Sequence, residues 1–415
     1  MLPELPREQI EKRYDDARSQ FRAIGVDTDK ALDTLSNVPI SLHCWQGDDV
    51  RGFEVHDSSV SGGGIMATGN YPGPATDATM LRQDAEKAMS LIPGKNRFNL
   101  HAIYAETDGK VVDRDQIGPE HFARWMDWSK KRNIPLDFNP TFFAHPKAND
   151  GYTLSHADAG IRRFWINHDK ACRRIAEAMG RNQGTPCVVN HWAPDGHKDQ
   201  PVDRKGPRQR LMQSLDDIFA ESIDPAFCKD AVECKLFGIG SEDYVVGSHE
   251  FYMGYALTRK IMLCLDMGHF HPTETIHDKI SSIFCFKNEL LLHVSRAIRW
   301  DSDHVVILND DIRNLFQQIV RGDYLSKTNI ALDFFDASIN RIGAWVVGTR
   351  AAKKGLLCAL LEPTAMLNDF ENNGDGAMKL AMLEELKTYP VGAVWDMFCL
   401  KYGMPAGSSW INSMT

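Results

Sequence analysis

Eight short runs of apolar and β-branched residues recur along the chain, and this pattern restricts the fold more than any other feature. Helical patterns lie between most of the runs, and strands that alternate with helices pair in parallel, with the helices as crossovers. Eight such units predict a closed (β/α)8 barrel of the α/β class, a TIM barrel, rather than an open sheet. The predicted strands are Pro39–Trp45, Arg97–Tyr104, Leu136–Phe143, Pro186–Trp192, Ala231–Gly238, Ile261–Asp266, Leu290–Ser295 and Asn329–Phe334, and the predicted crossover helices include Ala75–Leu91, Glu120–Arg132, Ile161–Met179, Pro207–Glu221 and Phe251–Arg259.

Further helical patterns precede and follow the barrel. Between Arg7 and Ala23, apolar residues recur at helical spacing, which predicts an amphipathic helix before the first strand. The helical patterns after the eighth strand are more than one barrel helix needs, so we expect a C-terminal helical extension of the kind that packs against a neighbouring subunit. The expected division is an N-terminal helical segment over 1–35, the barrel over 36–350 and the extension over 351–415.

The bulk properties exclude several classes of protein. The formal net charge is -9, and no basic stretch would neutralise a run of phosphates, so we expect no nucleic-acid partner. No apolar stretch is long enough for a membrane span, and the first residues do not form a signal peptide, so we expect a cytoplasmic protein without a membrane partner. The nine cysteines are scattered without a Cys-x-x-Cys pair, which is typical of buried reduced thiols.

Acidic and imidazole side chains occur at or just after the ends of four successive predicted strands. The carboxyl ends of barrel strands meet at one face, where buried acids and imidazoles would repel or stay unsatisfied without a cation between them. The Glu233-Cys-Lys235 segment places Glu233 and Lys235 on one face of its strand, because alternate residues share a face, and turns Cys234, the one thiol expected nearby, outward. The expected metal ligands are Glu233, Asp266, His269, His293, Asp301, Asp303 and Asp333.

Seven ligands are too many for one ion, so they predict two sites. We assign Glu233, Asp266, His293 and Asp333 to the first site. The second takes His269, Asp301 and Asp303, with Asp266 as a bridge. Oxygen and imidazole ligands without a thiolate suit Mn²⁺, Co²⁺, Mg²⁺ or Zn²⁺ and do not separate them. Taken singly, most of these residues also have ordinary structural explanations, and the metal interpretation depends on their joint placement.

Long stretches of the sequence resemble the bacterial L-rhamnose isomerase family over nearly the whole chain. The stretches that carry the resemblance are His43-Cys-Trp-Gln-Gly-Asp-Asp49, Asn99-Leu-His-Ala-Ile-Tyr104, Trp192-Ala-Pro-Asp-Gly-His-Lys-Asp199, Lys235-Leu-Phe-Gly-Ile-Gly240, Cys264-Leu-Asp-Met-Gly-His-Phe-His-Pro272, Leu291-Leu-His-Val-Ser295, Trp300-Asp-Ser-Asp-His304 and Leu332-Asp-Phe-Phe-Asp-Ala-Ser-Ile-Asn-Arg341. One departure is His191, where the family pattern leads us to expect an apolar residue, and we expect this side chain to lie outside the pocket.

The resemblance implies a metal-dependent interconversion of L-rhamnose and L-rhamnulose in rhamnose catabolism, by a homotetramer in a bacterial cytoplasm. It also implies that Mn²⁺ is held by His269, Asp301 and Asp303, and a second divalent ion by the other four ligands. This division agrees with the one made from the strand ends.

For this reaction we hypothesise a 1,2-hydride shift in the open-chain sugar. A water oriented by Asp301, Asp303 or Asp333 would carry the proton between O2 and O1. Lys235 would hold O1 or the bound water, His101 would assist ring opening, and His293 would also face the substrate. Trp45, Phe143 and Trp192 would form an apolar wall suited to a 6-deoxy sugar.

Other functions share parts of this pattern. A metal-dependent epimerase or aldolase shares the barrel and the metal but adds a general base near C3 or C4. A multi-metal hydrolase acting on nucleic acid is opposed by the acidic charge and by the missing basic groove. A non-catalytic sugar- or metal-binding protein would not need seven ligands with positions left open for water.

Overall fold

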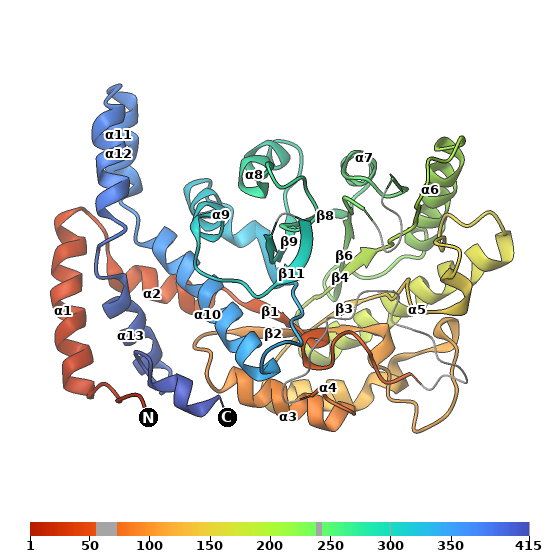
Figure 1. Cartoon of the computed structure of the whole chain (residues 1–415), viewed down its shortest axis with the longest axis horizontal. Coiled ribbons are helices and arrows are strands. Elements are labelled where there is room, and N and C mark those ends of the chain that lie inside the picture. The colour runs from red at the N-terminus through yellow and green to blue at the C-terminus, as the bar shows by residue number, and fades with distance from the viewer. Residues whose placement is uncertain (55–72, 238–242, 299, 415) are drawn as a thin grey trace.

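Eight parallel strands close into a barrel in the computed structural model of the chain, which confirms the predicted fold class (Figure 1). The order around the barrel is β1-β12-β9-β8-β6-β4-β3-β2, so strands that follow one another in the sequence are neighbours. The structure describes residues 1–54, 73–237, 243–298 and 300–414, with only the backbone described at 300 and 301. The barrel strands are β1 Ile40–His43, β2 Asn96–His101, β3 Leu136–Asn139, β4 Cys187–Trp192, β6 Cys228–Glu233, β8 Met262–Asp266, β9 Leu290–Val294 and β12 Thr328–Leu332.

Helices outside the barrel connect successive strands. α5 illustrates why they start and stop where they do: the Asp158 carboxylate accepts hydrogen bonds from the first backbone amides, and Gly184 ends the helix with a φ of 71°. The five predicted crossover helices are confirmed, and α8 and α9 add two that the sequence analysis did not single out. The crossover helices are α3 Ala78–Met89, α4 Ala123–Arg132, α5 Ala159–Gln183, α6 Lys205–Phe219, α7 His249–Thr258, α8 Ile276–Phe284 and α9 Asp310–Arg321, and α10 Arg341–Leu360 follows the last strand.

Several predicted strands run past the observed strand ends. β1 ends at His43, and the chain then turns through the 3-10 segment Cys44–Gly47 that carries Trp45. β3 ends at Asn139, before Phe143. The predicted strand Ala231–Gly238 ends as β6 at Glu233, and Gly238 lies outside the described residues. The residues beyond these ends belong to loops at the carboxyl face of the barrel.

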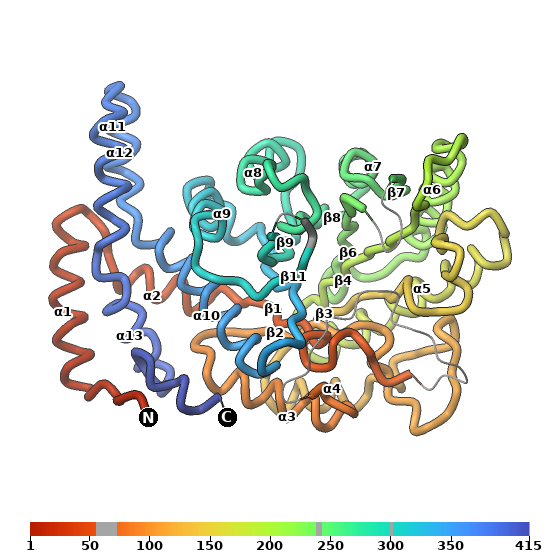
Figure 2. Tube along the Cα trace, viewed as in Figure 1, coloured from red at the N-terminus to blue at the C-terminus, as the bar shows by residue number. Residues whose placement is uncertain are grey.

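The helical segments at the two ends of the chain lie together beside the barrel. α1 Arg7–Ala23 is the predicted N-terminal helix, and it packs on α13 Val391–Lys401. The termini are close (Figure 2), and the Leu2 backbone amide donates to Asn412 Oδ1 at 2.9 Å. α2 Thr28–Asn37 leads into the barrel, and α11 Thr364–Asn372 and α12 Gly376–Glu385 form a hairpin that projects from the body (Figures 1 and 2).

The proposed three-part division of the chain stays a prediction. Its boundaries at 35/36 and 350/351 fall inside α2 and α10, respectively.

Two small antiparallel sheets sit on the loops at the carboxyl face. The first pairs β5 Gly196–His197 with β7 Tyr244–Val245. The second is the hairpin of β10 Arg296–Ile298 and β11 Trp300–His304, which follows β9 directly. Among the described residues, no helix is both long and apolar enough to span a membrane.

The barrel interior is apolar on one side and polar on the other. On the strands β4 to β12, the buried inner cluster consists of Val188, Ala231, Met262, Cys264, Leu291 and Ala331. On the opposite side, Asp137 of β3 accepts hydrogen bonds from Ser41 at 2.6 Å and from the Arg97 guanidinium at 2.9 Å. Because alternate residues of a strand share a face, the residues two positions later on each strand point inward at the carboxyl end.

His191 lies outside the barrel, as expected, because Asn190 and Trp192 on either side of it take the inner face of β4. Its two ring nitrogens lie 2.8 Å from an Asp169 oxygen on α5 and 3.0 Å from an Asp230 oxygen on β6. Burial alone would keep the ring neutral, but the charge of Asp169 and the hydrogen bonds with both carboxylates raise the pKa of His191 to about 9. The buried imidazolium of β4 therefore connects α5 with β4 and β6.

This pair of contacts predicts a pH-dependent stability. The pKa of His191 rises from about 6.5 in the unfolded chain to about 9 in the folded protein, so its contribution is complete below pH 6.5 and is lost as the pH rises through 9. The shift corresponds to roughly 3 kcal/mol of unfolding free energy. We expect the unfolding temperature of the wild type to fall more between pH 7 and 9.5 than that of His191→Gln, measured by scanning calorimetry. Parallel curves for the two proteins would contradict a charged His191.

Candidate metal centre

Four neighbouring strands deliver the expected first ligand set to one point at the carboxyl face. Glu233, Asp266 and His293 are the last inward-facing residues of β6, β8 and β9, and Asp333 follows β12 directly. The register pairs Asp266 with His293 across β8 and β9. The structure therefore brings all four side chains together, and one ligand atom from each lies within 4.8 Å of the others.

The imidazole of His293 stands at the centre of this cluster. Its Nδ1 atom lies 3.1 Å from Asp333 Oδ2, 3.3 Å from Glu233 Oε2 and 3.6 Å from Asp266 Oδ2. Its Nε2 atom has no hydrogen-bond partner among the described residues. The Nδ1 atom therefore lies among three carboxylates, and the Nε2 atom, on the other side of the ring, points away from them.

Neighbouring donors hold an oxygen of each of the three carboxylates. Trp45 Nε1 donates to Asp333 Oδ1 at 2.9 Å, and the Gly268 backbone amide donates to Asp266 Oδ1 at 2.6 Å. The side-chain amide of Asn190 donates to Glu233 Oε2. These bonds fix the carboxylates in orientations in which an oxygen of each faces the His293 ring, and such outer hydrogen bonds are typical of metal ligands.

The charges in the cluster are strongly perturbed. Burial opposes a charge on His293, but Glu233, Asp266 and Asp333 together raise the pKa of the ring well above its usual value. Burial raises the pKa of Asp266, and the charges of Glu233 and Asp333 add to this shift. Burial would also raise the pKa of Asp333, but the hydrogen bond with His293 lowers it.

One imidazolium offsets only one of the three carboxylate charges, whereas a divalent cation bound by the neutral ring offsets two. The donor set of three carboxylates and one imidazole is the set that Mn²⁺, Co²⁺, Mg²⁺ and Zn²⁺ accept in proteins. The residues present therefore fit a divalent metal ion.

The expectation that Cys234 is the one thiol near the cluster was wrong. The structure groups the Cys264 sulfur with Glu233 and His293 at ligand spacing, because Cys264 shares the inner face of β8 with Asp266. Burial and the nearby carboxylates raise the pKa of Cys264 well above its usual value, so the thiol stays protonated beside the acids. Cys234 does turn away, with its sulfur 3.9 Å from His249 Nδ1.

The expected second ligand set lies on two segments, the loop after β8 and the hairpin after β9. His269 Nδ1 lies 2.9 Å from Glu233 Oε1, and His269 Nε2 lies 3.1 Å from Lys235 Nζ, so both residues border the first cluster. Asp303 lies on β11 with a φ of 45°, and the side chain of Asp301 lies outside the described residues. Among the described side chains, the groups at metal-ligand spacing do not include His269 or Asp303.

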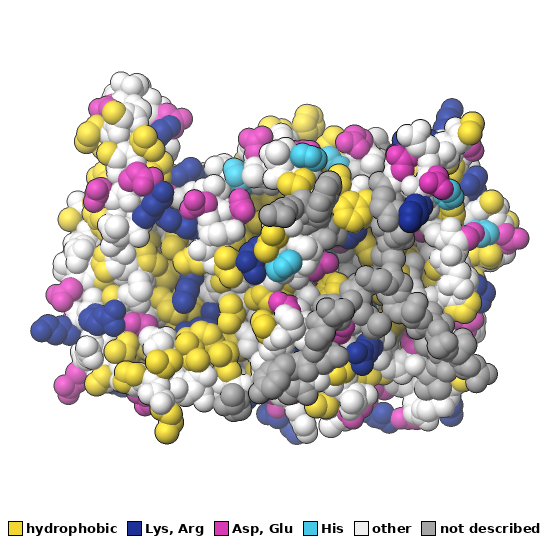
Figure 3. All heavy atoms as spheres, in the orientation of Figure 1, with side chains coloured by type: hydrophobic (Ala, Val, Ile, Leu, Met, Phe, Trp, Pro, Cys, Tyr) yellow, Lys and Arg dark blue, Asp and Glu magenta, His cyan; other side chains and the backbone are white. Residues whose placement is uncertain are grey.

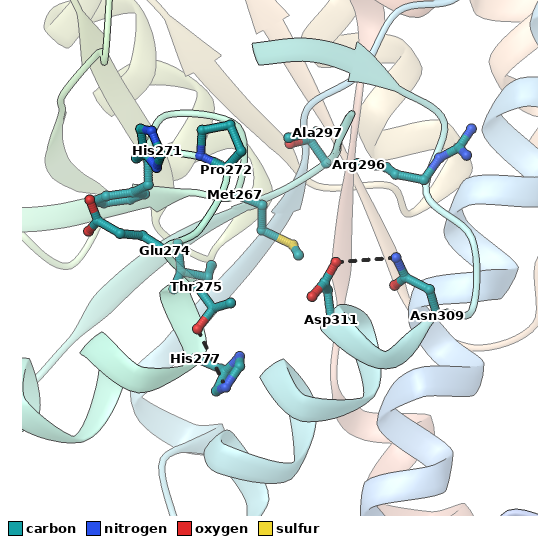
Figure 4. A pocket seen from close by; sticks show the side chains of 13 residues that line it. Met267, His271, Pro272, Glu274, Thr275, His277, Arg296, Ala297, Asn309 and Asp311 are labelled. Carbon is teal, nitrogen blue, oxygen red and sulfur yellow. Dashed lines mark hydrogen bonds between the residues drawn. The ribbon is translucent and has the colours of Figure 1, made fainter. Parts of the chain in front are cut away.

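A cavity is lined by residues of the loop after β8 and of the start of the hairpin (Figure 4). On one side are Met267 and Phe270, which flank His269, and on the other are Ser295, Arg296 and Ala297 at the start of the hairpin. Arg296 Nε donates to the Val305 carbonyl at 2.8 Å. The residues that line this cavity do not include His269 or Asp303.

The expected substrate residues form a continuous row of ring contacts along the mouth. His101 lies between Trp45 and Phe143, with ring-centre distances of 5.0 and 5.6 Å. Phe143 contacts Trp192 at 5.7 Å, and Trp192 stacks on His269 at 6.5 Å. Burial lowers the pKa of His101 to about 3, so its ring is neutral at physiological pH. The row ends where Lys235 Nζ lies 5.0 Å from the Trp192 ring centre.

Sequence reasoning missed residues that hold this row in place. The buried Arg114 guanidinium donates to the carbonyls of Thr141, Phe143 and Ala144 and pairs with Glu54 at 2.8 Å. Thr141 Oγ1 in turn lies 2.9 Å from His101 Nδ1. Nothing in the sequence around Arg114 marks this role. Asn190, by contrast, lies two residues before Trp192, and the alternation of β4 was a signal that placed it on the inner face.

Comparison with known proteins agrees with the geometry. The family described as L-rhamnose isomerase (RhaA) matches residues 8–415. An L-rhamnose isomerase of Rhodopirellula baltica is 58% identical over 98% of this chain and 94% of its own length, and one of Escherichia coli O157:H7 is 56% identical over 98% and 96%. Among solved structures, a D-psicose 3-epimerase with D-tagatose from Clostridium cellulolyticum H10 aligns at 10% identity over 78% of this chain and 96% of that one, with a TM-score of 0.47.

The cluster predicts that a divalent metal stabilises the protein. Mn²⁺ at about a hundred times its dissociation constant should add about 2.7 kcal/mol to the free energy of unfolding. We expect Mn²⁺ to raise the unfolding temperature of the chelator-treated wild type and to have little effect on Asp266→Asn, measured by differential scanning fluorimetry. Asp336→Asn is the matched control, because Asp336 accepts a hydrogen bond from the Ser338 backbone amide instead of joining the cluster. An equal shift in Asp266→Asn would remove Asp266 from the metal centre.

Proposed function

The chain belongs to the L-rhamnose isomerase family and isomerises L-rhamnose to its ketose, and we propose that it does so by a metal-assisted 1,2-hydride shift at the four-residue cluster. The observation that carries the mechanism is the convergence of three carboxylates, two of them buried, on the ring of His293 at the carboxyl face of the barrel. The epimerase, aldolase and hydrolase alternatives have no comparable support.

We assign one divalent ion to Glu233, Asp266, His293 and Asp333, and a Mn²⁺ ion to His269, Asp301 and Asp303. Bound divalent cations supply positive charge that polarises a sugar carbonyl and balances the alkoxide charge that develops during the reaction. The four-residue cluster supports the first assignment through its spacing and burial. The second is supported by the position of His269 at the edge of that cluster and by the resemblance of the sequence to the family.

The reaction moves one hydride and one proton and needs no redox cofactor. The hydride leaves C2 and arrives at C1, while the proton of the C2 hydroxyl is transferred to O1, so that the aldose becomes a ketose without net oxidation. We assign to Lys235 the task of holding O1 as charge develops there, because its ammonium lies at the rim beside His269 and Trp192. Asp333 and Asp301 orient the proton carrier between the two oxygens.

The row of rings provides the apolar side of the pocket. The rings of Trp45, Phe143 and Trp192 form a hydrophobic surface that can contact the methyl group of a 6-deoxy sugar. They also keep bulk water from the reacting carbons. His101 is neutral and hydrogen-bonded to Thr141, so it serves ring opening as a hydrogen-bond partner of the sugar rather than as a strong base.

We also propose that the protein acts as a homotetramer in the cytoplasm. Supporting the assembly, exposed apolar side chains occur on the projecting α11–α12 hairpin (Figure 3), where Met378 and Leu380 are 50% and 61% exposed. Light scattering measures the mass of the assembly directly, and four chains is the expected result. Cell fractionation tests the location.

Metal removal tests the function. After treatment with a chelator, the protein should form no ketose from L-rhamnose, and activity should return with Mn²⁺ or Co²⁺. Because the apolar wall suits a 6-deoxy sugar, L-rhamnose should be converted faster than L-mannose or D-xylose under the same conditions. Ketose formation is followed by chromatography for each pair of metal and sugar. No product from L-rhamnose with Mn²⁺, Co²⁺, Zn²⁺ or Mg²⁺ would exclude the proposal.

Lys235→Met tests the role of the ammonium group. Removing a charge that assists proton and carbonyl chemistry should lower kcat by about 100-fold, while the dissociation constant for Mn²⁺ changes little. Lys279→Met is the matched control, because Lys279 on α8 pairs with Glu274 at 2.6 Å, away from the cluster. A variant that loses Mn²⁺ binding but keeps its turnover when saturated would make Lys235 a structural partner of the ligands.

A further inference from the structure

Asn190 is buried on the inner face of β4, beside the metal ligands, with 2% of its surface exposed. Its Nδ2 atom donates to Glu233 Oε2. A carboxylate can only accept, so this contact fixes the amide nitrogen on the Glu233 side and the amide oxygen on the opposite side. Asn190 Oδ1 has no hydrogen-bond partner among the described residues.

His293 shows a matching unsatisfied atom. Its Nδ1 atom faces the three carboxylates, which makes Nδ1 the nitrogen available to a cation. The ring proton is then carried by Nε2, and Nε2 has no acceptor in the described part of the chain. Histidine ligands of metals almost always donate this second N–H to a carboxylate, a carbonyl or a water.

Both residues border the same space. Asn190 and His293 line a cavity of ≈ 60 Å³ inside the barrel, below the cluster, together with Ser41, Asn99 and Asp137. Asn99 Oδ1 is also without a partner among the described residues. A water needs about 10–15 Å³ of such space and two or more polar partners, so this cavity has room and partners for a few waters.

We propose that ordered water fills this cavity, accepts the hydrogen bond of His293 Nε2–H and donates to Asn190 Oδ1, which makes Asn190 a positioning residue for the metal centre. Its amide nitrogen holds Glu233, and its amide oxygen holds the water that fixes the tautomer and the orientation of His293. The inference rests on the proposed metal centre. It adds to that centre the Asn190 amide and a water, neither of which is a metal ligand.

Asn190→Leu tests the proposal, because leucine has a similar size but neither holds Glu233 nor binds water. We expect it to weaken Mn²⁺ binding at the four-residue cluster by about 10–100-fold, the usual effect of losing an outer hydrogen bond of a ligand, and to change little the binding of the ion assigned to His269, Asp301 and Asp303. The dissociation constant is measured by competition with a chelating dye on the full-length protein. The unfolding temperature of the metal-free variant should be lower than that of the wild type, because the buried Glu233 carboxylate loses a donor.

Asn329→Leu is the matched control. Asn329 lines the lower end of the same cavity, and its amide donates to Glu289 at 3.0 Å and to the Leu290 carbonyl, away from the cluster. Its Mn²⁺ affinity should equal that of the wild type. Asn190→Ala provides a second variant that leaves more room for water, and we expect it to lose less affinity than Asn190→Leu.

A high-resolution crystal structure of the wild type should show a water within hydrogen-bond distance of both His293 Nε2 and Asn190 Oδ1. A dry cavity, or Mn²⁺ binding by Asn190→Leu equal to that of the wild type, would overturn the role of Asn190 and leave the metal centre intact. Wild-type protein that binds no Mn²⁺ would overturn the metal centre and this inference together.

Discussion

The crowding of Glu233, Asp266 and Asp333 around one imidazole is the constraint on which the site depends. Three carboxylates that are held close together in a buried place repel one another, and a single protonated ring offsets only part of that repulsion. The folded chain tolerates the arrangement because Trp45, Gly268 and Asn190 donate to the carboxylate oxygens. The remaining negative charge is what gives the site its affinity for a cation.

The barrel creates this crowding through two simple regularities. The register of the parallel strands pairs Asp266 with His293, Glu233 with Cys264 and His293 with Ala331, so each ligand lies level with its neighbour or one inward-facing position away from it. Alternation then sends every second side chain inward, which puts Cys264 below Asp266 and Leu291 below His293. The ligands are therefore carried on or directly after strands that pair on both sides, whereas the expected second set lies on the loop after β8 and on the hairpin after β9.

The sequence predicted the eight strands, their parallel order and the four-residue cluster, because all of these follow from local patterns. The strand ends were less well predicted, since Trp45 and Phe143 continue an apolar run into loops whose conformation depends on distant partners. Cys264 was missed although the alternation that turns Cys234 away also turns Cys264 inward. Arg114 had no signal at all, because its role arises from carbonyl groups that only the fold brings within its reach.

Three consecutive residues of β4 have different tasks on the two sides of the barrel wall. Asn190 and Trp192 face the pocket side, while His191 between them joins α5 to β6 through Asp169 and Asp230. Inserting or deleting one residue in this strand would exchange its two faces, placing the imidazole in the interior and the amide and indole against the helix. In natural or engineered relatives we therefore expect length variation in the loops on either side of β4, but a constant number of residues within it.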